Sequence, residues 1–395
     1  MTAVVAVPQV GESADLTAYC RLHLSSLARS DQKKWGEVYV RGLVSVPGRK
    51  SIRRIADQVV GRRADQALQQ FVNQSTWRWE PVRRSLALQA AEIVQPKAWV
   101  AMEAVFPKHG ASSVGVAKQY APSAGRVVNC QLGLALFMAG TDASCPVNWR
   151  LLLPGCWDTD NPRRARTHLP DTERPRPRWH YLVDAVDQMT LGWNLPAAPL
   201  LFDATHEPDL EPRLRSLEER GLQYVVQVAP NASASWWAGL RQAGGPIPTA
   251  GEFAALAARS NTQPLVSQTY TTGGTRIVAA SVPRPEGQSW FTARANFAPQ
   301  QLVAIWPAGQ PKPKSLWLTN ISRARLPELT ELISLHSRTA DDLRHLEDSV
   351  GLQHFEGRSF PGWHHHVTLA SMAHAYNLTQ AVPLRQSEKR YLLSG

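Results

Sequence analysis

One apolar stretch constrains the fold more than any other: residues 99–106, which end in a Pro-Lys-His-Gly turn at 107–110. Its length and residue types are those of a buried strand, and the turn lifts the chain out of the sheet. A second apolar run, residues 199–203, also ends on a carboxylate, Asp203. If the two runs are neighbouring strands, Glu103 and Asp203 lie near each other at the sheet rim, where open α/β sheets place their ligands.

The spacing of apolar residues divides the chain into four segments. Residues 1–95 show helical spacing and predict an N-terminal helical domain. Strand patterns begin at residue 96, and from residue 181 they alternate with helices. Residues 231–311, rich in Gly, Ser, Thr and Pro, predict a β-rich insertion between two parts of one core, 96–230 and 312–395. The predicted fold class is therefore α/β with a mixed sheet. Strand patterns lie at residues 99–106, 113–120, 127–138, 147–153, 200–203, 223–229, 266–270, 276–281, 289–295 and 316–319.

The charge balance indicates what kind of partner the chain binds. Lys and Arg number 43 against 32 Asp and Glu, which gives a net charge of +11 and a pI near 9.8. Polyanions such as DNA are the expected partners, and a solvated basic surface is the alternative. No apolar run reaches the roughly 18 residues of a membrane helix, and no signal peptide is evident, so we expect a cytoplasmic protein that binds no membrane.

Basic residues gather in three parts of the sequence and at one position near its end. We expect them to contact DNA phosphates, each adding about one unit to the salt dependence of binding. The alternatives are a solvated face of the helical domain and a solvated loop in the Pro- and Arg-rich connection at 154–178. The predicted DNA-binding residues are Arg49, Lys50, Arg53, Arg54, Arg62 and Arg63 in the helical segment, Lys108 after the first strand, Arg163, Arg164, Arg166, Arg174, Arg176 and Arg178 in the connection, and Arg358 near the C-terminus.

Several segments, taken in order, resemble the DDE-type insertion-sequence transposases of bacteria. The resemblance covers about residues 20–380. It implies an RNase H-like core interrupted by the β-rich insertion, with a DNA-binding helical domain before it. The similar segments are residues 29–35, 39–43, 67–75 with Trp77, 113–120, 129–131, 149–154, 217–222, 351–352, 354–359 and 362–369.

The resemblance also implies a reaction that needs three carboxylates. In such enzymes they hold two divalent ions about 3.5–4 Å apart, which clamp the attacking and leaving oxygens of a phosphodiester. Aligned on the Phe-x-Lys-x-Gly pattern that starts at Phe106, the family's first aspartate falls on Met102, and Glu103 matches the acidic position after it. A thioether is not the hard oxygen ligand that Mg²⁺ prefers.

Of the other two acids, one is retained and one is replaced. The second aligns with Asp203, and the third, counted back from Gly351, falls on Ala340. We therefore predict no metal site. A substitute set of Glu103, Asp203 and either Asp341 or Asp342 is the alternative. However, Glu103 faces away from Met102 on a strand, and Asp341 is turned about 100° from Ala340 around a helix.

Two histidine-containing patterns suggest further sites. Neighbouring residues on a helix point about 100° apart, so the run His364 to His366 cannot share one metal well, and structural or phosphate-facing roles are expected. Asp203, His206 and Glu207 could form a new acid–base site, but the sequence offers no obvious nucleophile for it.

The sequence predicts a transposase-derived DNA-binding protein that has lost metal-dependent strand cleavage, with regulation as one role. An active DDE transposase that uses Glu103, Asp203 and Asp341 is the first alternative. A repurposed enzyme or interaction protein on the same scaffold is the second. No cofactor is expected, and Mg²⁺ only if cleavage survives. The expected partner is DNA, and the expected location is the cytoplasm, at the nucleoid. Whether the chain forms a homodimer is left open by the sequence.

Overall fold

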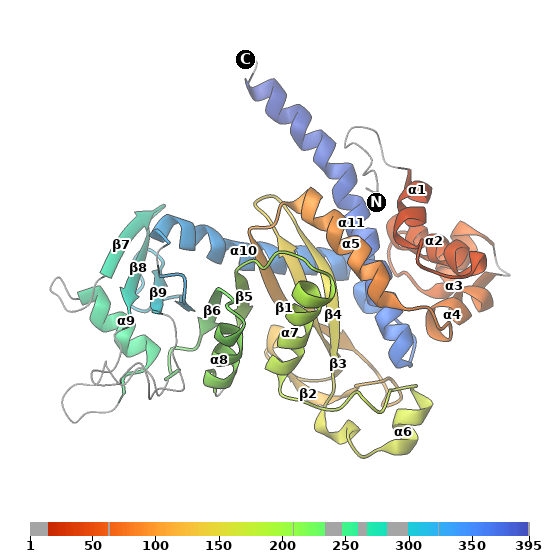
Figure 1. Cartoon of the computed structure of the whole chain (residues 1–395), viewed down its shortest axis with the longest axis horizontal. Coiled ribbons are helices and arrows are strands. Elements are labelled where there is room, and N and C mark those ends of the chain that lie inside the picture. Colours follow the sequence, from red (N-terminus) through yellow and green to blue (C-terminus); the bar gives the residue numbers. More distant parts are fainter. Residues whose placement is uncertain are drawn as a thin grey trace.

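The computed structural model describes residues 15–61, 64–207, 209–233, 247–259, 267–282, 299–322 and 324–393 (Figure 1). Arg62, Arg63 and the strand expected at 289–295 lie outside the described residues. The boundaries expected for the four segments stay predictions. The fold itself is mixed α/β, as the sequence predicts.

Helices form the N-terminal part of the chain. Asp15 begins the first of them by accepting a hydrogen bond from the Thr17 amide, and Ser51 caps α3 in the same way through the Arg54 amide. Between α2 and α3 the chain turns at Gly48, whose φ of 64° favours glycine. Figure 1 shows α1 to α4 as a group beside the core, with α5 lying along the sheet. The helices are α1 (Leu16–His23), α2 (Ser30–Ser45), α3 (Ile52–Val59), α4 (Asp65–Asn73) and α5 (Trp79–Val94).

The core sheet has the strand order of an RNase H-like fold. In the order β4-β3-β1-β5-β6, β3 is antiparallel to both β4 and β1, and β5 and β6 run parallel to β1. β2 pairs with the first part of β3. These strands are β1 (Ala98–Pro107), β2 (Ala117–Ala121), β3 (Arg126–Ala139), β4 (Ser144–Leu152), β5 (Leu200–Asp203) and β6 (Tyr224–Val228).

The β-rich segment continues this sheet rather than forming a separate one. β10 pairs antiparallel with β6, and β9, β8 and β7 follow in turn. Three of these strands come from the range 231–311 that the sequence predicts as an insertion. The elements are α9 (Ala250–Arg259), β7 (Ser267–Thr272), β8 (Thr275–Ser281), β9 (Gln301–Trp306) and β10 (Ser315–Thr319).

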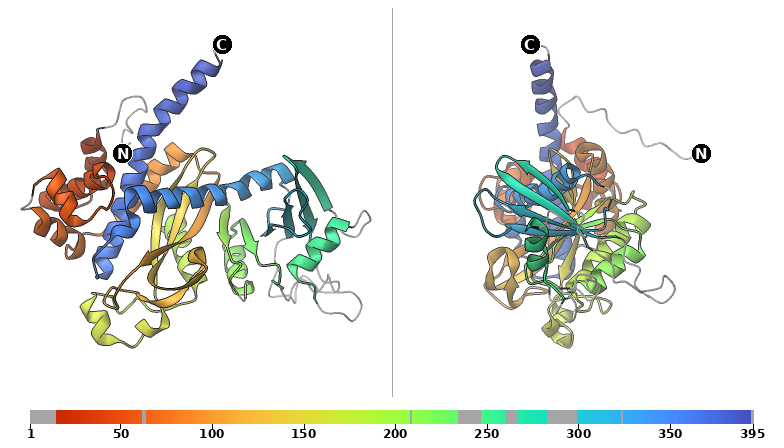
Figure 2. Two further views of the ribbon diagram at one scale, coloured as in Figure 1. Left: turned by 180° about the vertical axis from the view of Figure 1, so that it is seen from behind. Right: turned by 90° about the vertical axis from the view of Figure 1, so that its left-hand side faces the viewer.

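Helices cover both faces of the core sheet. α7 and α8 lie on one face, and α5, α10 and α11 lie on the other, where Figure 2 shows α10 running across the back of the sheet and the end of α11 leading away from it. No helix among the described residues is long and apolar enough to cross a membrane. The remaining helices are α6 (Asn161–Arg166), α7 (Arg178–Asp187), α8 (Glu211–Glu219), α10 (Leu326–His345) and α11 (Phe360–Leu393).

A buried guanidinium joins α5, β4 and α11. Arg83 is 1% exposed and donates to the Thr368 hydroxyl at 2.8 Å and to the Trp149 carbonyl at 2.9 Å. It also lies 3.0 Å from His364 Nδ1. Because its hydrogen bonds are satisfied, this cation holds the helices against the sheet without a carboxylate.

The next two histidines of α11 join the N-terminal helices to the core. The ring nitrogens of His365 lie 2.8 Å and 2.9 Å from the carbonyl oxygens of Val72 and Trp77, and its ring stacks on that of Trp77. His366 Nδ1 lies 2.9 Å from the hydroxyl of Tyr39 in α2. Both histidines are buried, so of the two expected roles, structural or phosphate-facing, they have the structural one here.

Candidate functional site

The register of β1 and β5 determines which side chains share a face at the sheet rim. Trp99 lies beside Leu200 and Val100 beside Leu201. Continued by two residues, this parallel register sets Met102 beside Asp203. Because side chains alternate along a strand, these two point to the face covered by α10 and Glu103 points to the opposite face. The arrangement matches the alignment that assigns the missing acid to Met102.

The α10 face of the rim carries Asp203 and the imidazole of His336. Asp203 is exposed, and its Oδ1 accepts from the Thr205 amide at 2.7 Å. His336 of α10 lines the same pocket, and its Nε2 is buried without a hydrogen-bond partner among the described residues. Burial lowers the pKa of His336, and the charge of Asp203 opposes that shift. Ala340, the aligned position of the third acid, lies one turn further on and packs against the core.

On the opposite face, Glu103 is bound by an arginine. Arg178 is the first residue of α7, and its Nη1 lies 2.9 Å and 2.8 Å from the two carboxylate oxygens of Glu103. Burial raises the pKa of Glu103, and Arg178 opposes the rise. Glu103 and Asp203 both line one pocket at the rim. The two carboxylates point to different sides of the sheet.

A second ion pair lies next to the first. Arg213 of α8 is 4% exposed, and its Nη1 lies 2.5 Å from Glu207 Oε1. Its guanidinium also lies 4.2 Å from the centre of the Phe202 ring. Burial raises the pKa of Glu207, and Arg213 opposes the rise. On this face both arginines are already neutralised by carboxylates.

These residues line a pocket of about 700 Å³ at the ends of β1 and β5. The aromatic rings of Tyr120, Trp179 and His206 also line it, with the Tyr120 and His206 rings 5.4 Å apart. The volume falls within the range of small-ligand pockets. The predicted acid–base group of Asp203, His206 and Glu207 does come together here, but Glu207 is occupied by Arg213.

The rim does not fit the two-metal site of DDE enzymes. The face that should carry the acids has a thioether from Met102, one carboxylate from Asp203 and an imidazole from His336. Two divalent ions need several hard oxygen ligands. Within the part of the chain that the structure describes, no group of three His, Cys, Asp or Glu residues could hold a metal ion.

The substitute acids on α10 are engaged elsewhere. Asp341 is exposed and pairs with Arg344 on the same helix. Asp342 accepts from the amide and the hydroxyl of Ser144, at 2.9 Å and 2.7 Å, and so fastens α10 to the start of β4. The alternative set of Glu103, Asp203 and Asp341 is not assembled in this structure.

Two of the predicted DNA contacts are buried. Lys50 is 4% exposed, and its Nζ donates to the carbonyls of Leu43 and Val46, which closes the end of α2. Arg164 is 2% exposed and donates to three carbonyl oxygens of its own connection at 2.8–3.1 Å. Both cations hold the backbone together, so neither is available to a phosphate in this structure.

Three further basic residues also bind the chain's own backbone. Lys108 donates to the Phe355 carbonyl, and burial lowers the pKa of Lys108 to about 8. Arg54 and Arg163 donate to carbonyl oxygens at 3.0 Å and 2.7 Å. The guanidinium of Arg163 lies 4.0 Å from the centre of the Trp157 ring.

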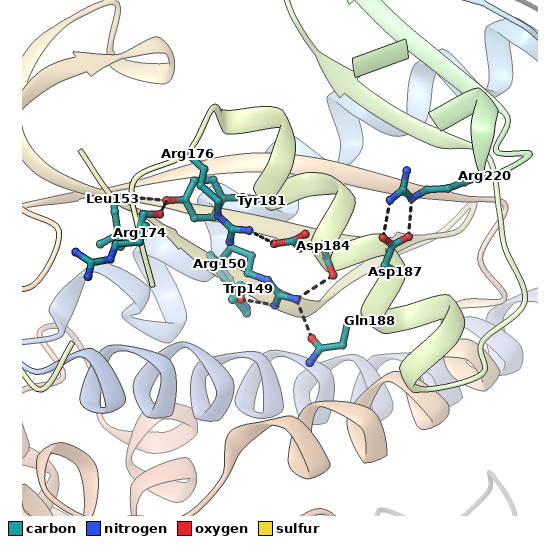
Figure 3. A network of polar contacts seen from close by, with 10 residues as sticks. All are labelled: Trp149, Arg150, Leu153, Arg174, Arg176, Tyr181, Asp184, Asp187, Gln188 and Arg220. Atoms are coloured by element: carbon teal, nitrogen blue, oxygen red, sulfur yellow. Dashed lines mark hydrogen bonds and ion pairs between the residues drawn. The ribbon is translucent and has the colours of Figure 1, made fainter. Parts of the chain in front are cut away.

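Arginines of the Pro- and Arg-rich connection tie it to α7, as Figure 3 shows. Arg176 lies 2.5 Å from a carboxylate oxygen of Asp184 and 4.8 Å from the centre of the Tyr181 ring. The Tyr181 hydroxyl donates to the Arg174 carbonyl at 3.1 Å. From β4, Arg150 reaches the Asp184 carbonyl at 3.1 Å. With Arg178 bound to Glu103, these contacts fix the end of the connection beside the pocket, which Pro177 and Arg178 line.

Four predicted residues remain exposed around a different opening. Arg49 pairs with Glu356 at 2.7 Å. Arg53, Arg166 and Arg358 line a cleft between the N-terminal helices and the core, and none of them forms an ion pair among the described residues. Among the predicted cations that the structure describes, Arg53, Arg166 and Arg358 thus stand apart from those that bind carboxylates or backbone carbonyls of other segments.

The sequence interpretation assigned no site role to two residues of the rim. His336 lines the same pocket as Asp203, and the sequence places it one helical turn before Ala340, on the same helix face. Arg213 could not be found from spacing, since its partner Glu207 lies in the preceding loop and the pairing depends on how α8 packs on β5.

Comparison with known proteins gives the chain a family. Residues 23–269 match the family described as DDE superfamily endonuclease. No curated protein matches the chain. A solved structure of the piggyBac transposase synaptic complex with hairpin DNA is similar over 94% of this chain and 72% of that chain, with 13% identity and a TM-score of 0.41. Because the family match spans well over half of the 395 residues, the chain belongs to the DDE superfamily endonucleases.

Proposed function

We propose that this protein is a DDE-family DNA binder that does not cut DNA. One observation carries the proposal: Met102, Asp203 and Ala340 occupy the three positions where carboxylates are required, and the same face adds only the imidazole of His336. A family member that binds DNA without cutting it cannot transpose it, so we propose a regulatory or structural role on DNA.

The chemistry of the three side chains supports this reading. A thioether and an imidazole favour softer metals than Mg²⁺, and a single carboxylate neutralises only one of the four positive charges that two ions carry. Glu103 cannot help without giving up Arg178 and turning to the other face of the sheet. Each replacement removes a ligand by a separate change.

The DNA-binding part of the proposal rests on charge and on the family. The net charge is +11, and the free arginines Arg53, Arg166 and Arg358 lie together at one cleft. A protein with such a surface binds polyanions with an affinity that falls as salt rises.

Incubation of the protein with a supercoiled plasmid that carries the DNA flanking its gene, with Mg²⁺ or Mn²⁺, tests both parts. We expect a salt-sensitive mobility shift and no nicking above that of Asp203→Ala. Metal-dependent nicking that Asp203→Ala abolishes would favour the alternative of an active transposase. Absence of a shift even at low salt would overturn the DNA-binding part.

A further inference from the structure

A cleft of about 540 Å³ opens where three distant parts of the chain meet. One wall is formed by α3 and α4, the second by the end of α6 with the turn after it, and the third by the loop before α11. The lining residues are Ile52, Arg53, Asp65, Gln69, Asn73, Gln74, Arg166, His168, Glu356, Gly357, Arg358 and Ser359.

Positive charge in this cleft is not neutralised by the protein. Arg53 and Arg358 make no side-chain hydrogen bond or ion pair among the described residues, and Arg166 donates only to a carbonyl of its own helix at 3.2 Å. Of the two acids that line the cleft, Glu356 is paired with Arg49. Within the described part of the chain, three free guanidiniums therefore face a single unpaired carboxylate, that of Asp65.

The wall that carries Arg358 is held in place by close contacts with α4. The Ser359 hydroxyl donates to the Asn73 carbonyl at 2.8 Å and accepts from the Gly362 amide at 3.1 Å. A Cβ on Gly357 would lie only 1.9 Å from Asn73 Oδ1, so the loop can approach α4 this closely only with glycine there. That Asn73 oxygen is buried and has no hydrogen-bond partner among the described residues.

The chemistry of the lining matches the sugar–phosphate backbone. Arginine and carboxamide side chains are among the groups that contact phosphate and sugar oxygens, and Gln69 and Gln74 line the cleft together with the three arginines. The rim pocket differs because its two arginines are already paired with carboxylates and Asp203 would repel a phosphate.

We propose that this cleft binds the backbone of duplex DNA and that the bound strand bridges the N-terminal helices and the RNase H-like core. The inference rests on the proposed function and adds the place and mode of contact. Arg53, Arg166 and Arg358 come from three walls, so one strand that touches all of them fixes those walls relative to one another.

The test replaces Arg53, Arg166 and Arg358 together by Gln and measures binding of a fluorescent random-sequence duplex across a salt series. Loss of three phosphate contacts lowers the slope of log affinity against log salt by about 2.7 and weakens binding about 500-fold at about 0.1 M salt. A matched control replaces Arg259, Arg276 and Arg338, which are exposed on α9, β8 and α10, with the same loss of charge. We expect this control variant to change the slope of log affinity against log salt by less than one unit.

Two outcomes separate this inference from the proposed function. If the wild type binds the duplex and the cleft variant keeps its slope, or the control loses as much, the cleft is not the site although the protein still binds DNA. If the wild type does not bind at low salt, the proposed function fails as well. A second variant has Lys at the three positions and so keeps the charge. We expect it to retain the wild-type slope. If all variants also have the wild-type melting temperature, misfolding does not explain the loss of slope in the Gln variant.

Discussion

Arginines and carboxylates line both the rim of the sheet and the cleft beside the N-terminal helices, but the arginines are paired with carboxylates only at the rim. At the rim, Arg178 and Arg213 are each bound to a glutamate. At the cleft, three arginines face solvent without ion pairs among the described residues. Both regions look basic in the sequence, yet only one offers its charge to a ligand.

The difference shows how the two regions contribute to function. A guanidinium that is paired within the fold serves stability and positions its neighbours, and a free one adds to long-range attraction for DNA. The loss of cleavage that we propose at the rim is therefore compatible with the DNA binding that we propose at the cleft, because the two depend on different side chains.

Acidification should weaken contacts that the N-terminal helices make. Burial lowers the pKa of His23 and of His366 to about 4; His23 joins α1 to α5, and His366 joins α2 to the core. An unfolded histidine with a pKa near 6.5 takes up a proton first. The stability that these residues support is therefore present above about pH 6.5 and lost as the pH falls toward 4.

At about pH 5 the loss is about 2 kcal/mol for each of these histidines, or about 4 kcal/mol together, relative to neutral pH. Urea unfolding at the two pH values measures it. His366→Asn should reduce the pH dependence by about 2 kcal/mol, whereas His109→Asn at an exposed position should not reduce it. Equal pH dependence in both variants would show that the buried histidines are not responsible.

At the rim, Arg213→Ala should destabilise the fold by about 3 kcal/mol, because it leaves the carboxylate of Glu207 largely buried without its partner. Thermal unfolding measures the change. The charge-matched control Arg215→Ala, on the more exposed face of the same helix, should cost less than about 1 kcal/mol. A small effect of Arg213→Ala would mean that the pair is not held as the structure shows.

A smaller effect is expected for Glu103→Gln. The amide keeps one hydrogen bond to Arg178 but not its charge, and because Arg178 is partly exposed the cost is about 1 kcal/mol. DNA affinity should rise slightly or stay the same, since the change frees a cation outside the cleft. A large loss of DNA binding would instead place the rim within the DNA contact surface and break the comparison.

Much of the fold could be predicted from periodicity. The strand expected at 99–106 is β1, and the strand at 200–203 is β5 as predicted. The short helix α6 was not expected, because Pro and Arg dominate its segment; it begins where Asp160 accepts from the Arg163 amide at 3.0 Å. β9 was also missed, and the strand expected at 113–120 is shorter, Ala117–Ala121.

The site was less predictable, and the reason is physical. Alternation along a strand correctly sets Glu103 on the face opposite to that of Met102, because alternation follows from the pleat of the backbone alone. Which arginines are free could not be deduced, because Lys50 and Arg164 find carbonyl partners only once the backbone has folded around them. Charge in a sequence gives the number of cations but not their availability.

The most direct test of the central claim is Mn²⁺ binding to the wild-type protein, followed by electron paramagnetic resonance against Asp203→Ala. With Met102 and Ala340 at two of the three acid positions, we expect no binding at the rim, so the two proteins should give the same titration up to millimolar metal. A site in the wild type that Asp203→Ala removes would contradict the account and restore the case for an active DDE enzyme.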